Sequence, residues 1–252
     1  MLQDETPEFA DRVVWLDRMP VSHRGVIVAN EVLDALPVER FLIKEGAVRQ
    51  LRVTDELGEF VFVDESAPDV LADAVSAVEH DIGATLPNQY VSEISLSAPA
   101  WIGDMAGSLQ QGFTFLFDYG LSRSEYYAGD RNEGWLRCYF RHRAHSDPLI
   151  LPGIQDLTAW VDFSAVAKAA VEHGLTVAGY LSQTQFLLGG GLDKEVGDMS
   201  ELPLESQLEL SGQIKILTLP GEMGENVKCI GLARGDIPWP DAFESVDRTH
   251  TL

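Results

Sequence analysis

Two apolar runs in this chain stop abruptly on polar side chains, and this pattern constrains the fold more than any other. The runs are residues 25–29 (GVIVA) and 113–117 (FTFLF). Short runs rich in branched or aromatic residues and bounded by polar ones are typical of buried strands. The side chains that follow are Asn30, Glu31 and Asp34 after the first run, and Asp118 and Tyr119 after the second.

Strand-like and helix-like segments alternate along the chain, which predicts an α/β fold. Residues 39–53 and 59–64 alternate apolar and polar side chains around two glycine-containing turns, and this pattern predicts an antiparallel meander with one wet face. Further strands are expected at residues 12–16, 175–181 and 226–235, and helices at 66–80 (capped by Ser66), 97–112, 162–174, 182–192 and 204–218.

The polar ends of the two apolar runs form a candidate ligand site. In open α/β sheets, ligands bind beyond the carboxyl ends of the strands. If the two runs are neighbouring strands, their terminal carboxylates meet at one edge, where they could orient a cationic ligand or take a proton from it. The alternative is that Glu31 or Asp34 only caps the turn that follows its strand. The pattern alone leaves both interpretations open.

Charge and composition exclude several classes of function. The chain of 252 residues carries 40 acidic and 18 basic side chains, a net charge of −22. Such a surface repels nucleic acid and anionic membranes, so neither is an expected partner. The two cysteines show no metal-binding or redox spacing, and no apolar stretch is long enough to span a membrane. We therefore expect a protein of the reducing cytoplasm.

Residues 119–161 are expected to be a long loop, and it is unusually basic. Five of the thirteen arginines lie between Arg123 and Arg143, together with several aromatic side chains. The loop could bind a carboxylate or an acidic partner segment. The alternative is a salt-bridge network that ties the loop to its own acidic surface. His142 and His145 have no further histidine or cysteine at ligand spacing, so no metal site is expected.

The following helix has its own candidate residues. Asp156, Thr158 and Asp162 precede or open the helix expected at residues 162–174, and capping is the simplest explanation for them. The glycines at 189–191 do not lie between a strand and a helix start, so they do not match a phosphate-binding loop.

Seven motifs occur in an order that resembles the MidA-like S-adenosylmethionine (SAM)-dependent methyltransferases, a family that includes a mitochondrial protein arginine methyltransferase. The resemblance covers residues 14–235. The motifs are ANEVLDALPVERF, SEISLSAPAW, FLFDYG, EYY, LRCYFRHRAHSDPLILPGIQDLTAWVDFSAV, GYLSQTQFLL and LPGEMGENVK. The resemblance implies a class I methyltransferase fold whose sheet ends in an antiparallel strand pair, with residues 175–181 and 226–233 as that pair.

The same resemblance implies roles for single residues. It implies SAM as the methyl donor and a protein side chain, arginine by analogy, as the acceptor. Asn30 and Glu31 would lie beside the donor and the acceptor. The residues expected to be catalytic are Asn30, Glu31, Asp34, Asp118 and Tyr119, and those expected to bind the substrate are His142, Arg143, Asp156 and Asp162.

Members of the family open with a strand, a glycine-rich turn and a helix, and this chain shows no such segment. A strand–helix–strand unit needs roughly 30 residues, and only eleven precede Arg12. We therefore expect a single, N-terminally truncated methyltransferase domain, with an inserted meander and helical region at about 39–112. The alternative function is a non-catalytic assembly module. The missing strands would leave a sheet edge open, which favours self-association.

Overall fold

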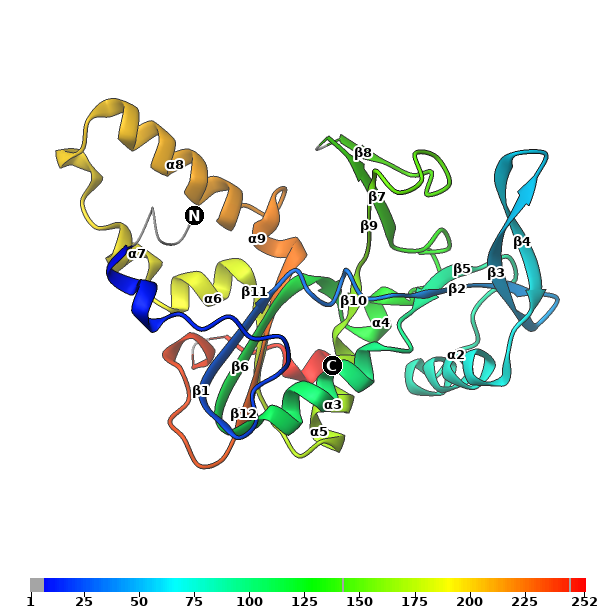
Figure 1. Cartoon of the computed structure of the whole chain (residues 1–252), viewed down its shortest axis with the longest axis horizontal. Coiled ribbons are helices and arrows are strands. Elements are labelled where there is room, and N and C mark those ends of the chain that lie inside the picture. Colours follow the sequence, from blue (N-terminus) through cyan, green and yellow to red (C-terminus); the bar gives the residue numbers. More distant parts are fainter. Residues whose placement is uncertain (1–6, 142, 245) are drawn as a thin grey trace.

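The central sheet is the feature that positions the candidate site. The computed structural model describes residues 7–141, 143–244 and 246–252. The strand order is β1-β6-β12-β11, with the short strand β10 beside the end of β6 (Figure 1). These strands are β1 (His23–Asn30), β6 (Leu109–Leu121), β10 (Val161–Asp162), β11 (Thr176–Ser182) and β12 (Val227–Arg234).

The predicted strand directions are confirmed. β1 and β6 run parallel, so their polar carboxyl ends lie at the same edge of the sheet. β12 is antiparallel to both β6 and β11, which is the antiparallel final pair that the resemblance implies. Among the described residues β1 has no partner on its other side, so it is an edge strand. Val26 and Val28 on its uncovered face are 56% and 64% exposed.

A glycine pair allows β1 and β6 to approach at their starts. Gly25 and Gly112 are register partners with φ of 145° and 139°, a region that side chains rarely adopt. A Cβ on Gly112 would lie 1.8 Å from the carbonyl oxygen of Gly25. The parallel pairing therefore requires glycine at residue 112.

Two helices cover one face of the central sheet. They are α3 (Ala98–Ser108) and α5 (Phe163–Glu172), and both pack on the main core. Asp162 caps α5, because its carboxylate accepts a 3.1 Å hydrogen bond from the backbone N–H of Ala165. Helix α3 is shorter than the helix predicted at 97–112, because residues 109–112 belong to β6.

The meander is confirmed as a second sheet of order β4-β3-β2-β5, at the right of Figure 1. Its turns at Glu45-Gly46 and Leu57-Gly58 have positive φ at both central residues, as tight hairpins require. The strands are β2 (Glu39–Lys44), β3 (Ala47–Glu56), β4 (Glu59–Ser66) and β5 (Val91–Ile94), and α2 (Asp69–Ile82) packs against them. Ser66 ends β4 and does not cap α2, so that expectation is wrong.

The expectation of one long loop over residues 119–161 is wrong, because a short helix and several short strands lie within it. A short helix α4 (Arg123–Tyr126) follows β6, and a third sheet of order β8-β7-β9 follows α4. Its strands are β7 (Leu136–Phe140), β8 (Arg143–His145) and β9 (Asp156–Ala159). Aromatic and arginine side chains stabilise this region through ring stacking, which leaves no periodic sequence pattern.

The chain after β11 carries several helices. The longest, α8, lies away from the central sheet at the upper left of Figure 1, and none of its residues is buried. The helices after β11 are α6 (Gln183–Gly189), α7 (Leu192–Val196), α8 (Leu204–Thr218) and α9 (Met223–Asn226), with short 3-10 turns η2 (Met199–Glu201), η3 (Asp241–Phe243) and η4 (Thr249–Thr251). A further 3-10 turn, η1 (Pro7–Arg12), precedes β1.

The strand expected at residues 12–16 is absent. Val14, Trp15 and Leu16 are 75%, 82% and 60% exposed and belong to no strand. The run has the composition of a strand, but no described strand lies beside it to accept its backbone hydrogen bonds.

Candidate functional site

The chain turns sharply where β1 ends. The backbone N–H of Glu31 donates a 2.9 Å hydrogen bond to the carbonyl of Phe117, which extends the pairing of β1 with β6 by one residue. Glu31 then adopts a left-handed conformation with φ of 50°. This turn leaves the side chains of Asn30 and Glu31 exposed beyond the end of the strand, with 3.5 Å between the Asn30 amide and the Glu31 carboxylate.

Asp118 holds the turn from the neighbouring strand. Its Oδ2 accepts hydrogen bonds of 2.9 and 3.2 Å from the backbone N–H groups of Leu33 and Asp34, and its Oδ1 accepts one from the N–H of Tyr119. Asp118 is 1% exposed. Its carboxylate therefore positions the backbone between β1 and β2.

Strand β9 closes the site from the other side. The N–H of Ala159 donates a 3.0 Å hydrogen bond to the carbonyl of Asp34, which brings the third sheet against the turn. The resulting hollow of about 460 Å³ is called the acidic pocket below. Its lining residues are Glu31, Asp34, Tyr119, Tyr139, Arg141, Ile154, Asp156, Thr158 and Trp160.

The acidic pocket raises the pKa of its own groups. Burial, together with the carboxylates of Glu31 and Asp156, raises the pKa of Asp34 to about 6. Burial, with a smaller effect from Asp34, raises the pKa of Asp118 to about 7. The pKa of Tyr119 is raised by burial and by Glu31. A cationic ligand would relieve the repulsion between these carboxylates.

Aromatic rings form the remaining walls. Tyr119 lies 6.3 Å from Trp160, and Trp160 stacks on Trp135 at 4.5 Å between ring centroids. Aromatic faces attract cations within about 6 Å of the ring centre. Carboxylates together with such faces suit a planar cation such as a guanidinium.

The structure brings together four of the predicted site residues: Glu31, Asp34, Tyr119 and Asp156 all line the acidic pocket. Asp118 lies beneath the pocket and does not line it. Asn30 is exposed beside Glu31, outside the lining.

Two predicted substrate residues lie outside the lining of this pocket. Arg143 is exposed on β8, and its neighbour Arg141 takes the place expected for it. Asp162 caps α5 and pairs with Arg123, with 2.8 Å between its Oδ2 and the arginine Nε. His142 lies outside the described residues. Capping is thus the confirmed alternative for Asp162.

The sequence pattern did not single out Tyr139, Ile154 and Trp160 as site residues. They lie on β7, before β9 and after β9, in the segment interpreted as a loop. The only signal was the number of aromatic side chains in that segment. Without the pairing of β7 with β9, their direction could not be predicted.

The structure tests one of the two explanations for the basic segment, the salt-bridge network, and binding of a carboxylate stays a prediction. Arg123 forms ion pairs with Asp81 and Asp162, which is the predicted salt-bridge network. The other four arginines form no ion pair with any described residue. Arg131 and Arg137 lie 4.9 and 5.7 Å from the centroid of the Trp135 ring instead.

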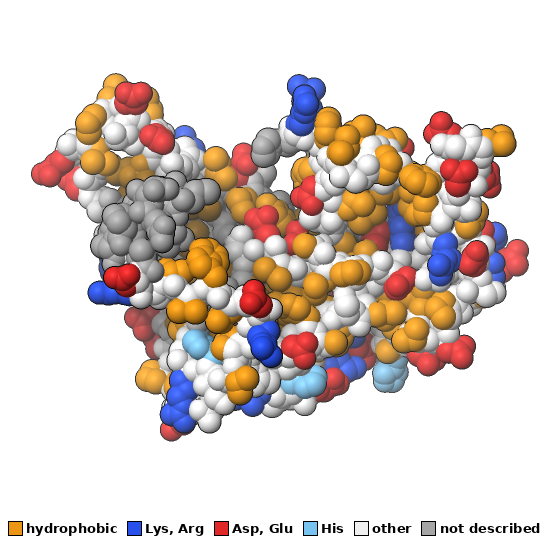
Figure 2. All heavy atoms as spheres, viewed as in Figure 1, with side chains coloured by type: hydrophobic (Ala, Val, Ile, Leu, Met, Phe, Trp, Pro, Cys, Tyr) orange, Lys and Arg blue, Asp and Glu red, His pale blue; other side chains and the backbone are white. Residues whose placement is uncertain are grey.

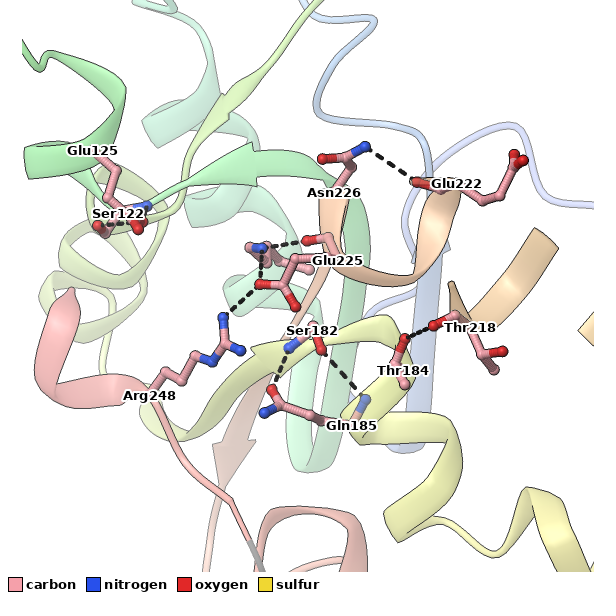
Figure 3. Close-up of polar contacts among 11 residues, drawn as sticks. Ser122, Glu125, Ser182, Thr184, Gln185, Thr218, Glu222, Glu225, Asn226 and Arg248 are labelled. Carbon is pink, nitrogen blue, oxygen red and sulfur yellow. Dashed lines mark hydrogen bonds and ion pairs between the residues drawn. The ribbon is translucent and has the colours of Figure 1, made fainter. Parts of the chain in front are cut away.

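A second polar cluster surrounds the start of β12, next to Tyr119 in register (Figure 3). The Glu225 carboxylate accepts hydrogen bonds from Lys228 at 3.1 Å and from Arg248 at 2.7 Å. Ser182 and Gln185 form a capping box at the start of α6. Glu225 thus joins the start of β12 to Arg248, and the capping box fixes the end of β11.

Gly224 belongs to the same cluster. A Cβ there would lie 2.4 Å from the Thr184 hydroxyl, which itself donates a 2.7 Å hydrogen bond to the Thr218 carbonyl (Figure 3). Glycine at residue 224 therefore leaves the room that this hydrogen bond needs.

An α/β sheet with a pocket of acidic and aromatic side chains at the carboxyl ends of two parallel strands is the arrangement of ligand-binding α/β proteins. The family model described as "Putative S-adenosyl-L-methionine-dependent methyltransferase" matches residues 1–181, and the chain belongs to this family. The predicted resemblance to the MidA-like methyltransferases is thereby confirmed.

Individual relatives agree with this assignment. The chain is 27% identical over 242 residues to the mitochondrial protein arginine methyltransferase NDUFAF7 homolog of Drosophila melanogaster, covering 92% of the chain and 53% of that protein. It is 30% identical over 210 residues to protein arginine methyltransferase NDUFAF7 of Mus musculus, covering 80% of the chain and 44% of that protein. The chain thus spans about half the length of these curated relatives.

Solved structures confirm the fold. A crystal structure of a Burkholderia thailandensis protein bound to S-adenosyl-homocysteine superposes with a TM-score of 0.89 at 36% identity, covering all of this chain and 64% of that one. A second crystal structure from the same organism gives a TM-score of 0.91 at 38% identity, covering 66% of that chain. The predicted class I methyltransferase type of α/β fold is confirmed.

Proposed function

We propose that this chain contributes the acceptor pocket of a SAM-dependent methyltransferase and that the acceptor is an arginine side chain of a protein. The observation that carries the proposal is the meeting of three carboxylates, from Glu31, Asp34 and Asp156, with aromatic rings in one pocket. The names of the curated relatives support arginine as the acceptor.

The residues at the end of β1 fit the positively charged end of the donor. The Glu31 carboxylate is exposed, and β1 is unpaired on its outer side among the described residues, so a cation can approach from there. Asn30 and Glu31 would hold the donor, which when bound supplies a methyl group on a positively charged sulfur. S-adenosyl-homocysteine in a related structure supports this choice of donor.

The chain's own residues would orient the acceptor. Carboxylates can hold a guanidinium through paired hydrogen bonds, so that one nitrogen faces the donor side. Methylation replaces an N–H bond by an N–C bond, and the proton must leave. Asp34 suits proton removal because its pKa of about 6 lies near neutral pH.

A methyl-transfer assay tests the proposal. The 252-residue chain would be incubated with SAM and an arginine peptide, alone and together with the part of the Burkholderia thailandensis protein that lies outside the match. We expect a mass increase of one methyl group on arginine. The proposal is contradicted if neither sample binds the donor in calorimetry and neither sample methylates the peptide.

The alternative is a non-catalytic assembly module that binds proteins through the same pocket. The unpaired edge of β1 supports it, because an open strand can bind another chain. Methyl transfer by the purified chain rules this alternative out. Peptide binding with no turnover in any mixture favours it.

Cellular location and assembly are also proposals. Charge and cysteine usage favour the cytoplasm, whereas the curated relatives are named as mitochondrial. Within the described residues, no helix has the length and apolar character needed to cross a bilayer. The open edge of β1 supports a homo-oligomer, and light scattering of the purified chain tests it.

A further inference from the structure

Three arginines near the acidic pocket have no acidic partner among the described residues, although the chain has an excess of acids. Acidic side chains outnumber basic ones by 40 to 18, yet none of the three forms an ion pair with a described residue. We call these residues the arginine strip: Arg131, Arg137 and Arg141. Arg143 is not included, because it pairs with Phe140 and therefore lies on the other face of the hairpin from Tyr139.

The arginine strip continues directly from the acidic pocket. Arg137 and Tyr139 lie two residues apart on β7, so they share one face of the strand, and Arg141 follows in the turn after β7. Tyr139 and Arg141 line the pocket. Opposite them on β9, Thr158 pairs with Arg137 and Asp156 pairs with Tyr139. Arg137 is thus two residues along β7 from Tyr139, the register partner of Asp156 in the pocket.

The tryptophan stack links the pocket to the far end of the strip. Trp160 lines the acidic pocket and stacks at 4.5 Å on Trp135, on whose ring Arg131 lies at 4.9 Å. An extended peptide rises about 3.3 Å per residue, so the distances from Trp160 to Trp135 and from Trp135 to Arg131 together correspond to about three residues. Figure 2 shows Lys and Arg side chains at the tip of the upper projection that contains β7 and β8.

We propose that the arginine strip docks an acidic segment of the protein whose cationic side chain enters the acidic pocket. The inference rests on the proposed function and adds a substrate class: proteins with Asp or Glu within about three residues of the modified arginine. The acidic pocket would bind the cationic side chain, and the arginine strip would bind the acidic side chains on either side of it.

An acidic protein segment is favoured over nucleic acid. A net charge of −22 repels a polyphosphate over long range, whereas a short acidic peptide contacts only the strip. Asp130 and Glu133 lie near Arg131 and Arg137 in a neighbouring hollow, which lowers the local positive charge. This mixed surface suits isolated carboxylates better than a continuous phosphate chain.

Fluorescence anisotropy with short labelled peptides tests the docking. The probes are a peptide with arginine at its centre and glutamates on both sides, its counterpart with glutamines, and the glutamate peptide with its arginine replaced by glutamine. We expect the first to bind the 252-residue chain about tenfold more tightly than the second, with a difference that shrinks at high salt. Equal affinity of the first two peptides overturns the inference.

Two sets of variants locate the binding surface. R131Q/R137Q removes two strip residues that do not line the acidic pocket, and it should abolish most of the preference for glutamate. R24Q/R52Q, on exposed residues of β1 and β3, is the matched control and should preserve it. R131E/R137E should bind a lysine-flanked peptide more tightly than the glutamate peptide. Retained glutamate preference in R131Q/R137Q with a native melting temperature overturns the inference.

The remaining outcomes separate the two proposals. Strip-dependent binding of the glutamate peptide that lacks arginine supports the inference even if no methylation occurs, in which case the proposed function alone fails. Methylation that is insensitive to flanking glutamates overturns only the inference. If an equal concentration of a single-stranded oligonucleotide displaces the peptide, the inference is overturned in favour of nucleic acid. If the chain dimerises through the arginine strip and binds no peptide, it is overturned in favour of a second copy.

Discussion

The carboxylate of Asp118 on β6 accepts a 3.2 Å hydrogen bond from the backbone N–H of Asp34, in the turn after β1. This contact joins two strands that are more than eighty residues apart in the chain. It also places one acid in the core as a support and the other in the pocket wall. Carboxylates that look equivalent in the sequence therefore have different roles.

Replacing Asp118 by asparagine should destabilise the fold by about 1–3 kcal/mol, because one carboxylate oxygen that accepts backbone N–H groups becomes a donor. The pKa of Asp118 is raised to about 7, so the folded state holds this proton more tightly than the unfolded chain. Its contribution to stability is complete in acid and is lost as pH rises through about 4 to 7.

Urea unfolding of both proteins at pH 5 and pH 8 measures this effect. The deficit of Asp118→Asn should be larger at pH 5 than at pH 8. A deficit that grows with pH would mean that the ionised carboxylate is the form that the turn requires.

Glu31→Gln should reduce methyl transfer at least tenfold and change the free energy of unfolding by less than about 0.5 kcal/mol, because Glu31 is exposed and its backbone hydrogen bond is kept. Initial rates and urea unfolding measure the two effects. Glu59→Gln, on the exposed strand β4, is the control and should change neither. Equal losses of activity and stability would make Glu31 a structural residue.

An arginine derivative whose amino and carboxyl groups are both blocked should bind this chain about fivefold more weakly as pH falls from 8 to 5. The pKa of Asp34 is raised to about 6, so this carboxylate becomes neutral across that range and attracts a cation less. Calorimetry across the range measures it. In Asp34→Asn the affinity should be lower at pH 8 and should vary less with pH, and an unchanged pH profile would assign the titration to another group.

Gly112→Ala should destabilise the protein by more than about 3 kcal/mol, because its Cβ would meet the Gly25 carbonyl at 1.8 Å. Gly107→Ala is the matched control, since a Cβ there meets nothing within 4 Å in helix α3. It should stabilise the helix by about 1 kcal/mol. Denaturant midpoints measure both changes, and similar stabilities of the two variants would contradict the close approach of β1 and β6.

Local chemistry made several elements predictable. Helix α5 could be predicted with its Asp162 cap, because capping and apolar periodicity act within a few residues. The turns at Gly46 and Gly58 were predictable for the same reason. In contrast, residues 12–16 have the composition of a strand, yet the pattern cannot supply a neighbour for them.

The site was predictable only in part. The ends of β1 and β6 point to one edge because parallel strands must, so Glu31, Asp34 and Tyr119 were found from the sequence. Tyr139 and Trp160 were not, because stacking between β7, β9 and the central sheet depends on contacts between distant segments.

By itself, the sequence determined the alternation of strands and helices, the antiparallel meander, and the family to which the chain belongs. Only the tertiary structure decided that Asp118 is buried while Tyr119, the next residue, faces the pocket. The physical reason is that successive side chains of a strand point to opposite faces. Which face meets a helix and which meets a ligand is set by packing between segments far apart in the chain.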